Sequence, residues 1–210
     1  MEIVIVVTIV IALALLLNRI IPSDEQTEQG SFFIDPRDGK KYRTVKIGDQ
    51  VWMAQNLNYY TQGSKYYGND ESNSQRYGRL YNWEAAMKAC PEGWHLPSDA
   101  EWRELINFAG GEEIAGTKLK ASFGWSDAFT GCSANGSDIY GFSALPGGYG
   151  CLDGSFIRFG YSGDWWSAGT WLGPSIWYIF GNKTIDFSRN PLKDNLYSVR
   201  CVQDVVPHSE

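Results

Sequence analysis

The chain has 210 residues, a formal net charge of −6 and a sequence pI near 5.0. This length suits one domain of ordinary size with an appendage. Because no lysine and arginine cluster is present, the chain lacks the electrostatic footprint of nucleic-acid binding, and we expect no nucleic-acid partner. The 9 tryptophans, 12 tyrosines and 23 glycines are typical of short strands joined by many tight turns.

Residues 1–30 are expected to form a hydrophobic helix and a short linker. From Ile3 to Leu17 the only polar side chain is Thr8, and a helix continuing through Ile21 would be about 30 Å long, enough to cross a bilayer. The basic residues that precede the apolar run of a secretory signal peptide are missing. The nearby Arg19 would favour a cytoplasmic location for the following domain.

This first stretch resembles the mature N-terminus of a type IV pilin: a first Met, one acidic residue near the start of a β-branched apolar helix, and a proline where many pilin helices bend. The resemblance implies that a basic leader is removed in front of residue 1. It also implies that the helix lies in the membrane before assembly and then packs in the core of a filament.

In such a filament Glu2 would pair with the terminal amine of a neighbouring subunit, because a carboxylate on an apolar helix is costly unless it is paired. The residues expected in the assembly interface are Met1, Glu2, Ile3, Ile5, Ile9, Leu13, Leu16 and Pro22. A simple membrane tether without a polymer remains the alternative.

Residues 31–206 are expected to form one globular domain, followed by a tail at 207–210. Its first segment alternates apolar and polar residues around two turn signals, DPRDGK and IGDQ, which predicts a hairpin-like start. The expected strand residues are Tyr42, Val45, Ile47, Val51 and Trp52.

Two helices are predicted next, over residues 82–90 and 99–108. Pro91 ends the first helix and Gly110 the second. Ser98 and Glu101 match the S-x-x-E capping box, which marks the start of the second helix. Short strand and turn elements follow in YGFSALPGGY, DWWSAG and YSVRCVQD.

Four motifs, GRLYNWEAA, CPEGWHLPSDAEW, GFSALPGGY and SVRCV, make the chain from about Phe33 to Asp204 resemble the Fibrobacter succinogenes major paralogous domain. The resemblance implies an α+β domain with a C-type lectin-like fold, related to the formylglycine-generating-enzyme group. Such domains occur in secreted and surface-attached bacterial proteins. The resemblance implies no settled biochemical activity.

The four cysteines all lie in this domain without a CxxC pair, so two disulfides are favoured over a metal or thioredoxin-like site. Disulfides imply an oxidising compartment. Sequence alone allows three pairings. C-type lectin-like domains commonly join a cysteine of the first helix to one in the last strand, which implies the pairs Cys90–Cys201 and Cys132–Cys151.

No catalytic role and no cofactor are expected. The chain has two histidines, His95 and His208, and His95 in its turn fits a structural role better than a catalytic one. Residues 68–74 and 133–138 gather the oxygen ligands that calcium prefers. Neither loop matches an EF-hand, and the EPN, QPD and WND motifs of sugar-binding C-type lectins are missing. Solvated loops are therefore favoured, with calcium left open.

The aromatic run WWSAGTWLGPSIWYIFGN is a candidate binding face, because its rings could stack on sugars or anchor a protein contact. Strand alternation must turn some of these rings inward, and we expect about half of them to be buried. In related lectin-like domains the loop before the last strand carries specificity, which here is residues 187–195. The candidate ligand-binding residues are Trp165, Trp166, Trp171, Trp177, Tyr178, Asn190 and Asn195.

The expected function is a structural subunit of an extracellular, cell-surface filament. Its N-terminal helices would self-associate in the core, and its lectin-like domains would be displayed outside for adhesion to a glycan or cell-surface ligand. The alternative is a membrane-anchored adhesin or carbohydrate-binding module that does not polymerise.

Overall fold

The computed structural model describes residues 31–127, 133–170, 173–181 and 184–205. The chain divides into two units, residues 1–30 and residues 31–210. The expected N-terminal helix and all of its assembly residues lie outside the described residues. In the described part, no helix is long and apolar enough to cross a membrane.

The described residues form a mixed α+β domain with four α-helices and three sheets, so the α+β part of the expected fold class is confirmed. The helices are α2 Ser74–Tyr77, α3 Trp83–Ala89, α4 Asp99–Phe108 and α5 Glu112–Leu119, with 3-10 turns η1 Tyr67–Asn69 and η2 Glu71–Asn73. The strands are β1 Phe32–Ile34, β2 Lys41–Ile47, β3 Gln50–Met53, β4 Ser64–Lys65, β5 Leu80–Tyr81, β6 Trp94–His95, β7 Tyr149–Gly150, β8 Phe156–Ile157, β9 Ser162–Thr170, β10 Gly173–Phe180, β11 Ile185–Arg189, β12 Tyr197–Ser198 and β13 Val202–Gln203.

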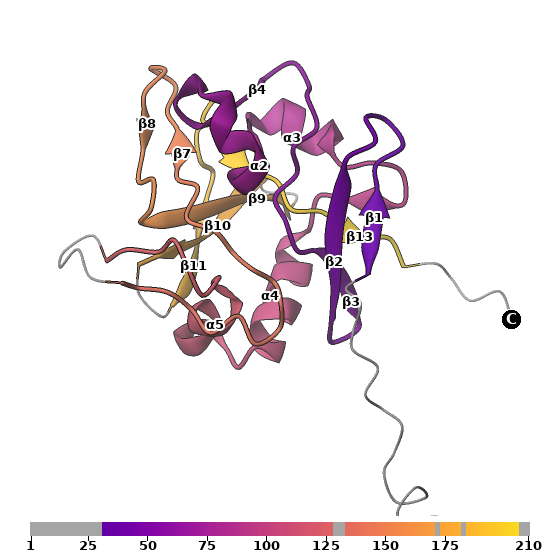
Figure 1. The fold of residues 1–210 in the computed structure, drawn as a ribbon, viewed down its shortest axis with the longest axis vertical. Helices are drawn as coiled ribbons and strands as arrows, with labels where there is room; N and C mark the ends of the chain where they lie inside the picture. The colour runs from indigo at the N-terminus through magenta and orange to yellow at the C-terminus, as the bar shows by residue number, and fades with distance from the viewer. Residues whose placement is uncertain (1–30, 128–132, 171–172, 182–183, 206–210) are drawn as a thin grey trace, which may run out of the picture. The chain divides into compact units, whose positions relative to one another are not determined.

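A five-stranded sheet in the order β1-β2-β3-β13-β6 joins the beginning and the end of the domain. The predicted hairpin is confirmed as β2 and β3, which are antiparallel with Val45 opposite Trp52. The last strand, β13, lies between β3 and β6. This arrangement places the two ends of the domain next to each other (Figure 1).

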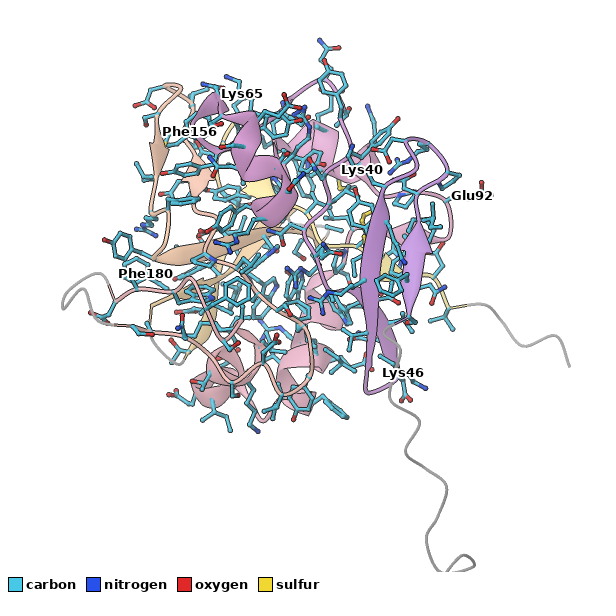
Figure 2. All side chains as sticks on the ribbon, viewed as in Figure 1. Lys40, Lys46, Lys65, Glu92, Phe156 and Phe180 are labelled. Carbon is cyan, nitrogen blue, oxygen red and sulfur yellow. A yellow bond between two sulfur atoms is a disulfide. The ribbon has the colours of Figure 1, made fainter. Side chains whose placement is uncertain are left out.

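The six-stranded sheet, in the order β11-β10-β9-β12-β5-β4, forms the middle layer of the domain. Its long strand β9 is antiparallel to β10 and parallel to β12, so it is flanked on both edges. Helix α3 packs on one face of this sheet, and α4 and α5 pack on the other (Figure 1). The sheet is therefore covered on both faces, and side chains fill the space between the layers (Figure 2).

Helix α4 begins and ends at the predicted residues, and both hydrogen bonds of its capping box are present. Its first residue, Asp99, is buried and ties the helix to the sheet. The Asp99 carboxylate accepts hydrogen bonds from the hydroxyls of Ser167 and Ser175, and from Nε1 of Trp177 at 3.2 Å. These bonds satisfy a carboxylate that would otherwise be costly to bury.

Helix α5 was not predicted, although its sequence EEIAGTKL contains good helix formers such as Glu, Ala, Lys and Leu. It contains Gly116, and glycine is a poor helix former. The helix buries Ala115 and Leu119 in the same core as Trp102. Because an isolated helix of eight residues is too short to be stable in water, tertiary packing stabilises it.

A disulfide between Cys90 and Cys201 is present, so this predicted pair is confirmed. Cys90 is the C-cap residue of α3, and Cys201 directly precedes β13. The two residues are 111 positions apart in the sequence. The bond therefore connects the layer that holds α3 with the last strand of the domain.

Candidate functional site

The predicted aromatic binding face is wrong for three of its residues. Trp165, Trp166 and Trp177 each have 0% of their surface exposed. Tyr178 is half-buried, and Trp171 lies outside the described residues. The three buried tryptophans cannot stack on a ligand at the surface of the domain.

The physical reason lies in the position of β9. Consecutive residues of a strand face opposite sides of the sheet, and here both sides are covered. Trp165 packs with Trp102 in the core under α4, whereas Trp166 packs against Trp83 and Tyr197 in the core under α3. The alternation that normally exposes every second residue therefore buries both.

Each buried indole also has a hydrogen-bond partner inside the domain. Nε1 of Trp165 donates to Oδ1 of Asn56 at 2.9 Å. Nε1 of Trp166 donates to the carbonyl of Tyr81 at 2.6 Å. Because these partners satisfy the polar atom of each ring, the rings are stable in the core.

The two predicted asparagines have different surroundings. Asn190 is exposed at the end of β11 and its backbone N–H donates to the carbonyl of Pro174. Asn195 is half-buried: its Oδ1 accepts from the N–H of Leu152 at 3.0 Å, and its Nδ2 donates to the hydroxyl of Tyr197 at 3.2 Å. The Asn195 amide thus positions the neighbouring turn, whereas Asn190 remains a candidate contact residue.

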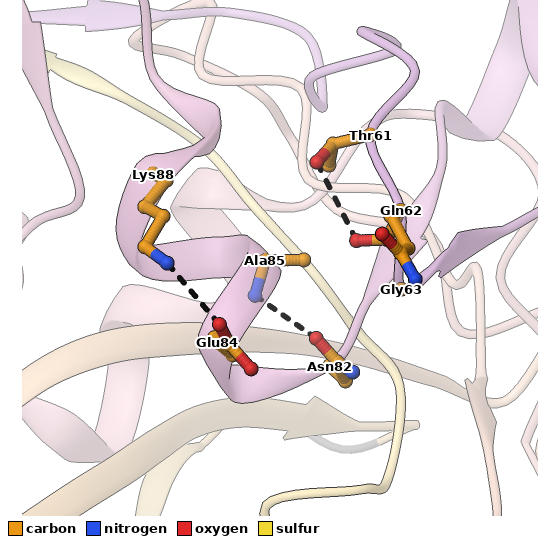
Figure 3. A pocket seen from close by; sticks show the side chains of 7 residues that line it. All are labelled: Thr61, Gln62, Gly63, Asn82, Glu84, Ala85 and Lys88. Carbon is orange, nitrogen blue, oxygen red and sulfur yellow. Dashed lines mark hydrogen bonds and ion pairs between the residues drawn. The ribbon is translucent and has the colours of Figure 1, made fainter.

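A polar pocket of about 550 Å³ lies between the loop before β4 and helix α3. Figure 3 shows Thr61 and Gln62 on the loop side, with Glu84 and Lys88 on the helix side. The full lining is Thr61, Gln62, Gly63, Asn82, Glu84, Ala85 and Lys88. These residues supply amide, hydroxyl, carboxylate and ammonium groups, which suit a ligand rich in hydroxyl groups.

Gly63 and Asn82 lie side by side in the lining of this polar pocket. The Asn82 side chain caps α3, with Oδ1 accepting from the N–H of Ala85 at 2.9 Å. Gly63 has φ +88°, and a Cβ at this position would lie 2.7 Å from Asn82 Oδ1. Only glycine fits here, because a side chain would clash with the cap and would strain the backbone.

The side chains of Glu84 and Lys88 are free to adapt to a ligand. They form an i,i+4 ion pair of 3.2 Å, with 82% and 73% of the two side chains exposed. Ion pairs this exposed add little stability. Exchange of this pair for contacts with a bound ligand would therefore cost the domain little.

His95 lies between two carboxylates. Its Nδ1 is 2.6 Å from Oδ1 of Asp204, and its Nε2 is 2.7 Å from Oε1 of Glu101. Burial lowers the pKa of the ring, but the hydrogen bonds to Asp204 and Glu101 outweigh burial and raise the pKa above its ordinary value. In this geometry the charged ring donates to both carboxylates and joins α4 to the residue after β13. His208 lies outside the described residues.

We expect this arrangement to make the stability of the domain depend on pH. Because the pKa of His95 is raised in the folded state, its stabilisation is complete below the unfolded value of about 6.5 and is lost as the pH rises through the folded value. Thermal unfolding from about pH 5.5 to about pH 8.5 should show this loss in the wild type but not in His95→Gln. Asp204→Asn should reduce the loss, and an unchanged pH profile in His95→Gln would contradict this role.

In each of the two loops considered for calcium, one aspartate is held in local hydrogen bonds. Asp70 accepts from the N–H of Ser72, and Asp138 accepts from the N–H and hydroxyl of Ser143. Within the described ranges, no group of three or more His, Cys, Asp or Glu side chains is placed to hold a metal ion.

The globular domain matches a known sequence family. The sequence model of the Fibrobacter succinogenes major domain matches residues 45–203, which is more than half of the chain. The chain belongs to this family. The comparisons with curated proteins and with solved structures found no significant match.

Two motifs of this Fibrobacter succinogenes major domain, SVRCV and GFSALPGGY, meet at a buried arginine. Arg200, from SVRCV, is fully buried and donates to Oδ1 of Asn56 at 2.8 Å and to the carbonyl of Phe142, from GFSALPGGY. Asn56 in turn donates to the carbonyl of Tyr77. Burial lowers the pKa of Arg200 to about 9. Arg200 and Phe142 therefore hold the core together, whereas Asn82, Glu84 and Ala85 of GRLYNWEAA line the polar pocket.

A second, smaller hollow of about 240 Å³ shares Gly63 and Asn82 with the polar pocket. Asp194, from the predicted specificity loop, and Cys151 are among its lining residues. Cys151 is half-buried and has a free thiol, so the structure does not contain the predicted Cys132–Cys151 disulfide. Cys132 itself lies outside the described residues.

Sequence reasoning did not identify the polar pocket of this Fibrobacter succinogenes major domain. One signal was present. Within GRLYNWEAA, Asn82 directly precedes a helix, and asparagine is a preferred residue at this N-cap position. The facing residues Thr61 and Gln62 come from a loop about twenty positions earlier, and no local pattern connects them to Asn82.

Proposed function

We propose that the chain is a structural subunit of an extracellular, cell-surface filament that displays the Fibrobacter succinogenes major domain on its outside. The observation that carries this proposal is the apolar run of residues 3–17, in which Thr8 is the only polar side chain. Such a segment is driven out of water and is buried either in a membrane or among copies of itself. The pilin-like features around it favour burial among copies.

Two observations support an extracellular location and a lectin-like domain. The Cys90–Cys201 disulfide suits an oxidising compartment. It also joins the end of α3 to the last strand, as in C-type lectin-like domains, and β13 pairs with β3 near the start of the domain. We therefore propose a C-type lectin-like fold, which an experimental structure compared with known lectin-like domains would test.

The displayed domain is proposed to be adhesive. Its buried tryptophans are part of the core, so recognition falls to its surface hollows. The polar pocket beside α3 offers hydrogen-bond donors and acceptors from four side chains, Gln62, Asn82, Glu84 and Lys88. This chemistry suits the hydroxyl groups of a glycan on a cell surface.

Glu2→Ala is expected to reduce the yield of filaments without unfolding the domain. The substitution removes the carboxylate that would pair with the terminal amine of an adjacent subunit. Negative-stain microscopy of material sheared from cells measures the yield, and non-reducing electrophoresis of the same material checks the Cys90–Cys201 bond. Glu25→Ala is the matched control, because it removes an acidic residue that lies beyond the apolar run.

Long fibres in the wild-type preparation support the filament. Dispersed or membrane-bound particles alone would instead favour the alternative, a membrane-anchored adhesin that does not polymerise. Equal fibre yields for Glu2→Ala and the wild type would contradict the pairing of Glu2. A glycan array probed with the sheared material tests adhesion, and the absence of any bound glycan would count against it.

A further inference from the structure

A hollow of about 300 Å³, here called the arginine pocket, lies where β2, α2 and the segments around Phe123 and Ser143 meet. Two arginines line it, Arg43 from β2 and Arg76 from α2. Its volume is at the small end of the range of ligand pockets, which starts near about 300 Å³. The pocket therefore suits a ligand of about the size of one sugar ring.

The arginines of this pocket form no ion pair in the described part of the chain, although the Asp138 carboxylate is linked to Arg43 through the hydroxyl of Ser143. Neither guanidinium has a carboxylate within ion-pair distance there, and no acidic residue lines the pocket. The chain as a whole has a net charge of −6. Two unpaired arginines in one concave site of an acidic protein are the feature that points to an anionic ligand.

Hydrogen bonds hold Arg43 at the pocket wall. Its Nη2 donates to the hydroxyl of Ser143 at 3.1 Å, and that hydroxyl donates to Oδ2 of Asp138 at 2.6 Å. Ser143 has φ +53°, a conformation that is costly for a residue with a side chain and that Asp138 stabilises through the N–H of Ser143 at 2.7 Å. The Asp138 carboxylate is thus engaged by Ser143, and the remaining N–H groups of Arg43 can bind a ligand.

A second donor lies beside Arg43. Oε1 of Gln55 accepts from the backbone N–H of Arg43 at 2.8 Å. Because this bond fixes the amide, Nε2 of Gln55 is the group left to donate. Gln55 also lines the pocket. The site therefore presents donors from at least three side chains, Arg43, Gln55 and Arg76, and this set matches the acceptor oxygens of a carboxylate.

One side of the pocket is aromatic. The ring of Phe123 is 47% exposed, and the guanidinium carbon of Arg76 lies 5.2 Å from its centre. This contact places the Arg76 guanidinium over the Phe123 ring. An exposed aromatic face beside two cations suits a ligand that has an apolar face and a negative group, as an acidic sugar has.

We propose that the arginine pocket binds a carboxylate-bearing sugar, such as a uronic acid residue of a surface glycan. The guanidinium groups of Arg43 and Arg76 bind the carboxylate, and Phe123 packs against the sugar ring. This proposal depends on the proposed function in one respect, namely that the domain is displayed for binding. Its test does not require a filament.

The experiment measures binding of glucuronate, glucose and glucose 6-sulfate to the detergent-solubilised full chain by NMR chemical shifts and calorimetry. We expect glucuronate to bind at least about tenfold more tightly than glucose, because charged hydrogen bonds are the stronger ones. Arg43→Gln and Arg76→Gln should each weaken the binding of glucuronate about tenfold. Lys46→Gln is the matched control, since it removes one positive charge from β2 outside the pocket (Figure 2) and should bind as the wild type does.

Several outcomes would overturn the proposal. Equal affinities for glucuronate and glucose would remove the anion specificity. If glucose 6-sulfate bound tightly and glucuronate did not, the group that the pocket recognises would be a sulfate ester and not a carboxylate. If the Arg43→Gln/Arg76→Gln double variant bound glucuronate with unchanged affinity, the binding site would lie elsewhere in the protein. Circular dichroism confirms that each variant is folded, and a filament defect with intact glucuronate binding would count against the proposed function alone.

Discussion

Trp165→Ala is expected to lower the free energy of unfolding by about 3 to 5 kcal/mol, the usual range for loss of a large buried aromatic side chain. The ring is fully buried and packs against Trp102, with centroids 6.1 Å apart. The substitution also leaves Asn56 without the N–H of the indole. Urea unfolding followed by circular dichroism measures the change.

Tyr60→Ala provides the aromatic control for this substitution. Tyr60 is 66% exposed, and the guanidinium carbon of Arg79 lies 5.0 Å from the centre of its ring. Its loss should change stability by at most about 1 kcal/mol. If Trp165→Ala instead unfolded at the wild-type urea concentration and lost ligand binding, the ring would be a surface contact and its core position would be wrong.

Removal of the disulfide by Cys90→Ala/Cys201→Ala is expected to lower the free energy of unfolding by about 4 to 5 kcal/mol. The bond closes a loop of 111 residues, and the chain-entropy treatment gives this magnitude for loops of that length. Structure retained in the unfolded chain would reduce the effect. Denaturant unfolding of the double variant and of the wild type measures it.

Cys151→Ser is the control for that experiment, because Cys151 is a half-buried free thiol in the structure. It should change stability by no more than about 0.5 kcal/mol. Non-reducing peptide mapping of the wild type should recover the peptides of Cys90 and Cys201 linked together. A peptide linking Cys132 to Cys151 would establish a second bond, and Cys151→Ser would then destabilise the domain by more than this limit.

Several elements could be predicted from the sequence because short-range interactions decide them. Ser98 and Glu101 are three residues apart and cap α4 with each other, so the start of this helix is encoded within four positions. The β2–β3 hairpin likewise follows from alternation around a two-residue turn. The Cys90–Cys201 pair was predicted from family resemblance, since no local signal selects one of the three pairings.

The candidate sites depend on contacts between distant segments, and only the tertiary structure decided them. Whether Trp165 and Trp166 face solvent depends on what covers each side of β9, and α3 and α4 come from elsewhere in the chain. The arginine pocket brings Arg43 next to Ser143, 100 positions later. A strand pattern specifies that the side chains of neighbouring residues alternate in direction. The arrangement of the whole chain decides which layers pack over each face of the sheet. Burial and pocket formation therefore could not be predicted from the strand pattern alone.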